Sequence, residues 1–120
     1  MSFKSLLAYQ KGFELAMNIF EVSKSFPKEE TYSLTDQIRR SSRSVCANIS
    51  EAYRKRRYER NFISKLTDSD AENSETQVWL EFAGACNYIC AETEKELNNK
   101  SLEVGKLLNY MIDNPGKFGV

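Results

Sequence analysis

The stretch LTDQIRRSSRSVCANISE, residues 34–51, decides how this chain folds. Its apolar residues recur at helical spacing and continue into Ala52, which predicts a helix with a narrow apolar seam. The seam residues are Leu34, Ile38, Val45, Ile49 and Ala52. Beside the seam runs a stripe of small or hydrogen-bonding side chains, Gln37, Ser41, Ser44, Asn48 and Glu51. We therefore expect this helix to contact other helices closely, either of the same chain or of another subunit.

The segment before this stretch predicts another helix, over residues 5–24. Its apolar residues repeat at spacings of three and four and mark the expected buried face: Leu6, Tyr9, Phe13, Ala16, Met17 and Phe20. Phe26-Pro27 ends the helix, because the residue before a proline is pushed out of helical geometry. Ser33 and Asp36 then form an approximate capping box that opens the second helix, over residues 34–56.

The segment after it predicts a long helix over residues 59–89 and a fourth over residues 94–112. One side of the long helix carries Phe62, Leu66, Ser69, Asn73, Thr76, Leu80 and Ala83. Because the middle of this side is small or polar, we expect the early half of the helix to be wetter and to leave polar surface that one bundle need not bury. Its later half widens the apolar surface with Val78, Trp79, Phe82, Ala85, Cys86 and Ile89, which predicts core. Thr93 and Glu96 form a second capping box for the fourth helix, and Asn114-Pro115-Gly116 ends it.

Nothing in the sequence predicts a strand, since no segment alternates with period two and no hairpin signal is present. A chain of 120 residues lies within the usual range of one domain. We therefore predict an all-α fold, an antiparallel up-down-up-down four-helix bundle that forms a single domain over residues 1–120.

Several function classes are disfavoured by what the sequence lacks. There is no histidine, which is the commonest general base and metal ligand, and no glycine-rich phosphate loop. The three cysteines are an odd number without a secretory signal, and we interpret them as small buried hydrophobes. No apolar run is long enough to span a membrane. We expect a cytoplasmic protein that is not an enzyme and uses no cofactor or metal.

The net charge of zero conceals a strong asymmetry along the chain. Residues 39–65 contain nine basic side chains against two acidic ones, which gives a charge of plus seven. From residue 66 onward ten acidic side chains face four lysines, which gives minus six. Such a chain can attract polyanions to one part of its surface, or pack head to tail with its own copies.

The basic segment supports two interpretations. Its side chains can hold nucleic-acid phosphates, or they can pair with carboxylates of a neighbouring helix or subunit. The candidate nucleic-acid-binding residues are Arg39, Arg40, Arg43, Arg54, Lys55, Arg56, Arg57 and Arg60. Tyr53 and Tyr58 place aromatic rings among them, which is compatible with base stacking. Because no groove-reading motif is present, recognition would concern backbone and shape, in RNA or DNA alike.

Two further residues admit more than one role. Glu51 can be an acidic catalytic group, but a hydrogen bond to Asn48 or an ion pair with Arg43 or Arg54 is the favoured interpretation. Trp79 can be a stacking platform for a base, but its apolar neighbours favour core or interface.

The ordered motifs of the chain resemble a known bacterial family. The residues that carry the resemblance are FPKEETYSL (26–34), QIRRS (37–41), SVCANISE (44–51), SETQVWL (74–80) and Tyr88. They closely resemble the bacterial four-helix bundle family, also called the 23S rRNA intervening-sequence protein family, over about residues 3–111. A related branch is the accessory variability determinant of diversity-generating retroelements.

The resemblance implies an antiparallel four-helix bundle that assembles as a ring-shaped homopentamer. In the retroelement branch, basic surfaces bind nucleic acid and a reverse transcriptase. A nucleic-acid-binding adaptor is therefore our first expectation for function. The alternative is a structural or protein-interaction oligomer whose arginines form intersubunit salt bridges and bind no nucleic acid. The expected subunit interface is the polar stripe, Gln37, Ser41, Ser44, Asn48 and Glu51.

Overall fold

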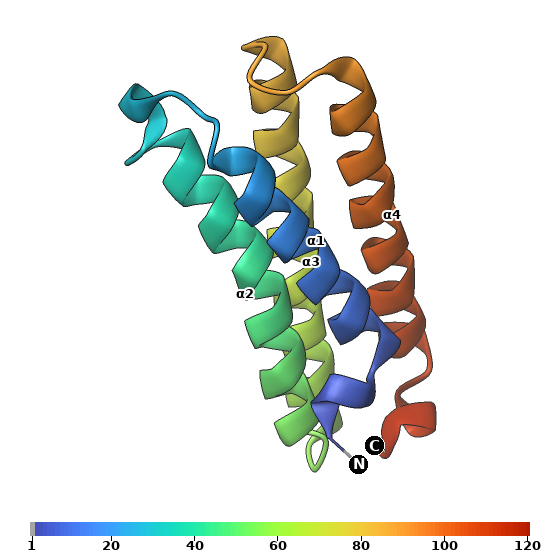
Figure 1. Ribbon diagram of the computed structural model, residues 1–120. Coiled ribbons are helices and arrows are strands. Elements are labelled where there is room, and N and C mark those ends of the chain that lie inside the picture. The colour runs from blue at the N-terminus through green and yellow to red at the C-terminus, as the bar shows by residue number, and fades with distance from the viewer. Residues whose placement is uncertain (1) are drawn as a thin grey trace.

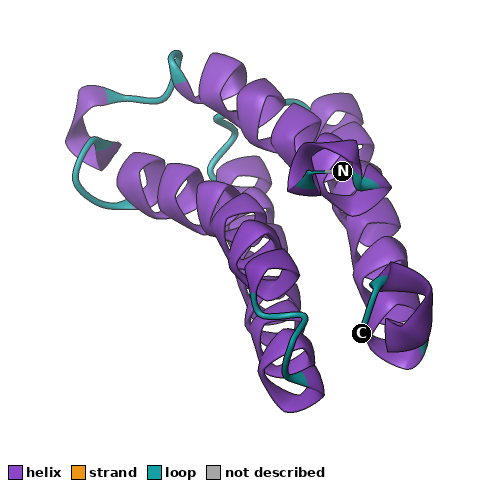
Figure 2. Cartoon of the chain, turned by 90° about the horizontal axis from the view of Figure 1, so that it is seen from below, coloured by secondary structure: helices purple, strands orange, loops and turns teal. Residues whose placement is uncertain are grey.

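Four long helices make up most of the computed structural model, which describes residues 2–120 (Figure 1). They are α1 (Leu7–Ser23), α2 (Leu34–Arg54), α3 (Glu59–Ala85) and α4 (Ala91–Asp113). Three short 3₁₀ helices flank them: η1 (Phe3–Ser5), η2 (Lys28–Glu30) and η3 (Pro115–Phe118). No strand occurs in residues 2–120 (Figure 2), so the predicted all-α class is confirmed.

The helices pack as an antiparallel bundle in which each contacts its two neighbours. α2 packs on α1 and α3, and α4 packs on α3 and α1. The bundle is elongated, with extents of 44 × 25 × 21 Å, and both termini lie at the end where α2 turns into α3 (Figure 1). None of the helices in residues 2–120 combines the length and the apolar character that crossing a membrane requires.

The core consists of two apolar clusters. One lies near the termini around Phe62 and Ile49, and the other lies at the far end around Ile38 and Leu80. The predicted seam of α2 is buried throughout, so its apolar spacing alone identified the buried face. The side of α3 from Phe62 to Ala83 is also buried throughout, which corrects the expectation of a wetter early half, because Ser69, Asn73 and Thr76 are at most 1% exposed.

A layer of buried polar side chains adds specific contacts to this core. Ser69 donates to the Val45 carbonyl at 2.8 Å and so joins α3 to α2. Asn73 donates to the Ser101 carbonyl at 2.9 Å, and the Ser101 hydroxyl lies 2.9 Å from Asn73 Oδ1. Asn73, Ser69 and Ser101 are at most 1% exposed, so these hydrogen bonds satisfy groups that water cannot reach.

The predicted face of α1 is partly wrong. Phe13 and Met17 are 51% and 43% exposed, whereas the buried side carries Ala8, Gly12, Leu15, Ala16 and Ile19. Small residues allow the close approach: a Cβ added at Gly12 would lie 3.4 Å from Cys46 Sγ on α2. The helix therefore turns its small residues and Leu15 inward, and leaves Phe13 and Met17 at the surface.

The turn between α3 and α4 also differs from the prediction. α3 ends at Ala85 rather than residue 89, because Asn87 adopts a left-handed conformation (φ 61°). The Asn87 and Tyr88 amides donate to the Gly84 and Ala83 carbonyls, which is the hydrogen-bond pattern of a Schellman helix end. Only part of the predicted widening of the core occurs: Trp79 and Ile89 pack against the far cluster, whereas Val78 and Phe82 are 46% and 54% exposed.

Both predicted capping boxes are wrong in detail. Ser33 occupies the N-cap position of α2, but its hydroxyl donates to Glu30 Oε1 at 2.6 Å. The same carboxylate oxygen accepts from the Leu34 amide, so Glu30 supplies the cap. α4 begins at Ala91 with Cys90 as N-cap, which places Thr93 inside its first turn.

The interpretation of the cysteines as buried hydrophobes holds for one of the three. Cys46 is buried, and burial raises the pKa of its thiol to about 11. Cys86 and Cys90 are exposed, because α3 ends earlier than predicted and both residues therefore lie in the turn before α4.

Candidate nucleic-acid and subunit interfaces

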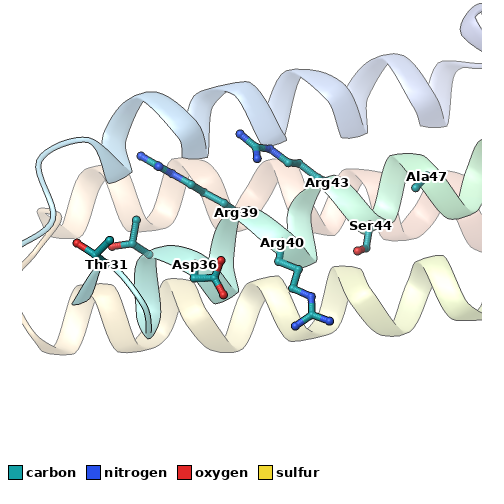
Figure 3. Close-up of a pocket in the computed structure, with 8 residues that line it drawn as sticks. Thr31, Asp36, Arg39, Arg40, Arg43, Ser44 and Ala47 are labelled. Atoms are coloured by element: carbon teal, nitrogen blue, oxygen red, sulfur yellow. The ribbon is translucent and has the colours of Figure 1, made fainter. Parts of the chain in front are cut away.

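Arg39 and Arg43 are arranged around an aromatic ring of the neighbouring helix. Both side chains extend from α2 toward α1 (Figure 3), where their guanidinium carbons lie 4.8 and 5.6 Å from the centre of the Phe20 ring. Arg39 Nε also donates to Ser23 Oγ at 2.8 Å. Lys24 Nζ lies 4.9 Å from the centre of the same ring. Phe20 thus gathers three cations, a role that its apolar spacing alone did not indicate.

Arg40 extends to the opposite side of α2, toward α3 (Figure 3). Between Arg40 and the pair Arg39 and Arg43 lies an open hollow of about 520 Å³. The remaining lining residues are small or polar: Thr31, Thr35, Asp36, Ser44 and Ala47. The outer surface of α2 therefore forms an open, shallow hollow with cationic side chains on both sides.

A second basic group lies where α2 turns into α3. Arg54, Lys55, Arg57 and Arg60 are exposed there. Arg54 and Arg57 line a hollow of about 540 Å³ together with Ser2, Phe3, Tyr53, Arg56 and Gly119. Arg43 and Arg54 are eleven positions apart on α2, so about 16 Å of helix separates the two groups. The eight predicted residues thus form two groups instead of one continuous surface.

Arg56 differs from the other arginines of the turn because its guanidinium is bound by other groups of the same chain. Its Nε donates to the Tyr53 carbonyl at 2.8 Å, and its Nη1 donates to the Phe118 carbonyl at 3.2 Å. Its guanidinium carbon stacks 3.6 Å from the centre of the Tyr53 ring. Arg56 therefore attaches the C-terminal η3 segment to the end of α2.

None of the seven arginines forms an ion pair within residues 2–120; the five ion pairs of this part of the chain all use lysine. Like-charged side chains that crowd together without carboxylate partners favour the binding of an external anion.

The predicted polar stripe is divided between the core and the surface. Ser41 is 1% exposed and its hydroxyl lies 2.8 Å from Thr76 Oγ1, so it joins α2 to α3 within one chain. Its assignment to a subunit interface is therefore wrong, because α3 already covers it. Gln37, Ser44 and Asn48 are half-buried and Glu51 is exposed.

Glu51 and Asn48 have partners that the sequence did not indicate. Asn48 donates to the Ser44 carbonyl at 3.0 Å. Glu51 pairs with Lys65 of α3 at 2.8 Å, instead of Asn48 or an arginine, and this ammonium lowers the pKa of the Glu51 carboxyl. The pairing follows from the packing of α2 on α3, which brings positions 51 and 65 together.

Trp79 contributes to an aromatic group at the far end of the bundle. Trp79 and Phe82 of α3 line a hollow of about 380 Å³ with Tyr32 and Cys86. Tyr32 is 93% exposed, and Phe82 is 54% exposed. Trp79 itself is half-buried, and its buried Nε1 has no hydrogen-bond partner within residues 2–120. This group lies away from the basic turn, which argues against Trp79 as a stacking platform for nucleic acid bound there.

Comparisons with known proteins agree with this architecture. The family model described as 23S rRNA-intervening sequence protein matches residues 4–110. A crystal structure of a protein of unknown function from the S23 ribosomal protein family of Bacteroides thetaiotaomicron is 34% identical, with a TM-score of 0.80. The match covers 89% of this chain and 96% of that one. A comparison with curated proteins found no match. The resemblance seen in the sequence is thus confirmed, and the chain belongs to the 23S rRNA-intervening sequence protein family.

Proposed function

We propose that this protein is a non-enzymatic, oligomeric adaptor of the cytoplasm that binds the phosphate backbone of nucleic acid through the basic turn between α2 and α3. The observation that carries the proposal is the exposure of Arg54, Lys55, Arg57 and Arg60 around this turn, with no carboxylate paired to any of them within residues 2–120. Each such cation that contacts a phosphate releases condensed counterions, which favours binding at low salt.

The arrangement favours backbone contacts over base readout. Tyr53 is 7% exposed and lies beneath Arg56, so it offers no free face to a base. Tyr58 is 60% exposed, but it is a single ring. Arginine and lysine on a convex turn position a backbone without reading base edges. We expect RNA and DNA to bind about equally, and the name of the family makes 23S rRNA a suitable first probe.

The proposal is tested with the triple variant R54A/R57A/R60A, which leaves the structural Arg56 in place. A matched control, K28A/K95A/K106A, removes the same number of exposed charges from other parts of the surface. Binding of labelled RNA and DNA duplexes is followed by fluorescence anisotropy between about 50 and 200 mM salt.

The triple variant should weaken binding of both polymers and flatten the plot of log affinity against log salt by about two to three units. The control should keep the wild-type slope. If the wild-type protein binds neither polymer at low salt, or if both variants lose affinity equally, nucleic-acid binding by the turn is rejected.

A second candidate function, a structural oligomer without nucleic-acid binding, is favoured by a different observation. Phe13 and Met17 lie next to each other on the outside of α1 and are 51% and 43% exposed, and Leu7 at the start of the helix is 52% exposed. Exposed apolar surface of this kind commonly marks a protein–protein interface. We expect the homopentamer that the family resemblance implies, which light scattering on a sizing column measures directly. A monomer at micromolar concentration would contradict the oligomer.

A further inference from the structure

Beside the basic turn, three segments that are distant in the sequence meet around one hollow. The end of α2, the N-terminal η1 and the C-terminal η3 all lie at this end of the bundle (Figure 1). The hollow measures about 540 Å³, and we call it the terminal hollow. Its lining residues are Ser2, Phe3, Tyr53, Arg54, Arg56, Arg57 and Gly119. Three of these seven residues are arginines and none is Asp or Glu, so the terminal hollow favours an anion.

One of the three arginines is held in a fixed orientation. Arg56 stacks on Tyr53, and two of its five N–H donors bond to the Tyr53 and Phe118 carbonyls, which leaves three donors for an external acceptor. Gly119 allows the C-terminal segment to approach so closely, since its φ is 87° and an added Cβ would lie 2.9 Å from Arg56 Nη1. Because little side-chain freedom remains to be lost on binding, Arg56 is suited to hold a phosphate.

The other donors of the terminal hollow are free. Arg54 and Arg57 are exposed, and neither forms an ion pair within residues 2–120. The Ser2 hydroxyl accepts from the Lys4 amide at 3.1 Å, so its own O–H remains available to donate. Three guanidinium groups and one hydroxyl therefore surround a space with no acidic side chain.

We propose that the terminal hollow binds the terminal phosphate monoester of a nucleic-acid strand, at its 5′ or its 3′ end. A monoester carries about −1.5 to −2 charge at pH 7 and offers three strong acceptor oxygens, whereas each internal phosphodiester carries a single charge. An internal phosphate also needs room for a nucleotide on each side, and a hollow bounded by three separate segments suits a chain end better. This inference rests on the proposed function and adds which part of the strand the basic turn selects.

Three single strands of one RNA sequence test the proposal. They carry a 5′-phosphate, a 3′-phosphate, or hydroxyl groups at both ends, and an internal label reports binding by fluorescence anisotropy. The wild-type protein should bind at least one phosphorylated strand about five- to tenfold more tightly than the hydroxyl strand, because hydrogen bonds to a charged group are worth more than neutral ones. Which phosphorylated strand binds more tightly identifies the end that is recognised.

Two serine variants locate the site without changing any basic residue of the turn. Ser2→Glu places a carboxylate at the terminal hollow and should remove the preference for a phosphorylated end. Ser5→Glu is the matched control: it adds the same charge to the same short helix, but Ser5 does not line the hollow, so the preference should remain. Both serines are exposed, and circular dichroism verifies that each variant is folded.

Two results would overturn the inference: equal affinity of the wild-type protein for all three strands, or a preference that the two serine variants keep or lose alike. Failure of the proposed function is recognised separately. Salt-dependent binding of all strands without an end preference rejects only the terminal hollow. Binding of phosphorylated strands alone supports the hollow and rejects backbone binding by the turn, and absence of binding to every strand rejects both.

Discussion

Replacing Arg56 by alanine should destabilise the folded chain by about 2 kcal/mol. The residue lies among the basic side chains predicted to bind nucleic acid, but its own contacts are within the chain. Hydrogen bonds from a charged donor contribute about 1.5–3 kcal/mol when shielded, and a partly exposed cation over an aromatic ring contributes about 0.5–1 kcal/mol. We take less than the sum of these values for two reasons. Arg56 is half-exposed, so solvent weakens its contacts, and its hydrogen bond to Tyr53 joins residues only three positions apart. The bond to Phe118 spans 62 positions and is therefore lost entirely on unfolding.

Chemical and thermal unfolding measure this effect against a neighbour of equal charge. Arg57→Ala removes an exposed arginine that has no hydrogen-bond or ion-pair partner within residues 2–120, and should stay within about 0.5 kcal/mol of the wild type. Arg56→Ala should lower the melting temperature by roughly 8 °C, since about 1 kcal/mol shifts it by about 4 °C in a chain of this length. Conversely, R57A should lower the salt slope of nucleic-acid binding by roughly 0.7–0.9 unit and R56A by less. Equal stability of the two variants, or an equal loss of slope, would refute the structural role of Arg56.

Three further measurements address other parts of the bundle. Asn73→Ala removes two buried hydrogen bonds with Ser101, whose hydroxyl keeps the Gln77 amide as a partner, and should cost about 2 kcal/mol in urea unfolding. A loss below about 0.5 kcal/mol would contradict a structural polar layer. Hydrogen bonds from Ser33 and Tyr88 lower the pKa of the Glu30 carboxyl in the folded protein. These bonds therefore stabilise the fold fully above the pKa that Glu30 has in the unfolded chain, and this stabilisation is lost as the pH falls through the lower pKa of the folded state. Tyr88→Phe should therefore lose less stability than the wild type between about pH 5 and pH 3, and parallel pH profiles would exclude the contact. Because burial raises the pKa of the Cys46 thiol to about 11, a thiol reagent at neutral pH should modify only the other two cysteines until the protein unfolds.

The helical pattern of α2 and α3 was readable from the sequence because it is a local property. In α2 the predicted seam is buried throughout, whereas in α3 the side from Phe62 to Ala83 is buried even in its polar early half, which we expected to be wetter. Helical spacing places these side chains on one side of the helix, whatever packs against them. In α1 the same criterion predicted the wrong buried face, because the apolar residues of this helix were compatible with more than one buried side. Packing selected the side with Gly12 and Leu15, since small residues let α1 approach α2 closely.

Helix ends were predicted less well than helix faces. The end of α3 depends on the left-handed conformation of Asn87, and the cap of α2 is the carboxylate of Glu30, outside the predicted box. Both depend on backbone geometry in the connecting segments, which apolar spacing does not encode.

The sequence by itself determined that this protein is an all-α bundle, which side of α2 is buried, and that a dense group of basic residues accompanies α2. Only the tertiary structure decided what each charged residue contacts. Arg56 meets the Phe118 carbonyl, Arg39 and Arg43 share the ring of Phe20, and Glu51 pairs with Lys65. The physical reason is the range of each effect. Helical spacing acts over three or four residues, whereas these partners lie on different helices, or 62 positions apart for Arg56 and Phe118, and meet only once the helices pack.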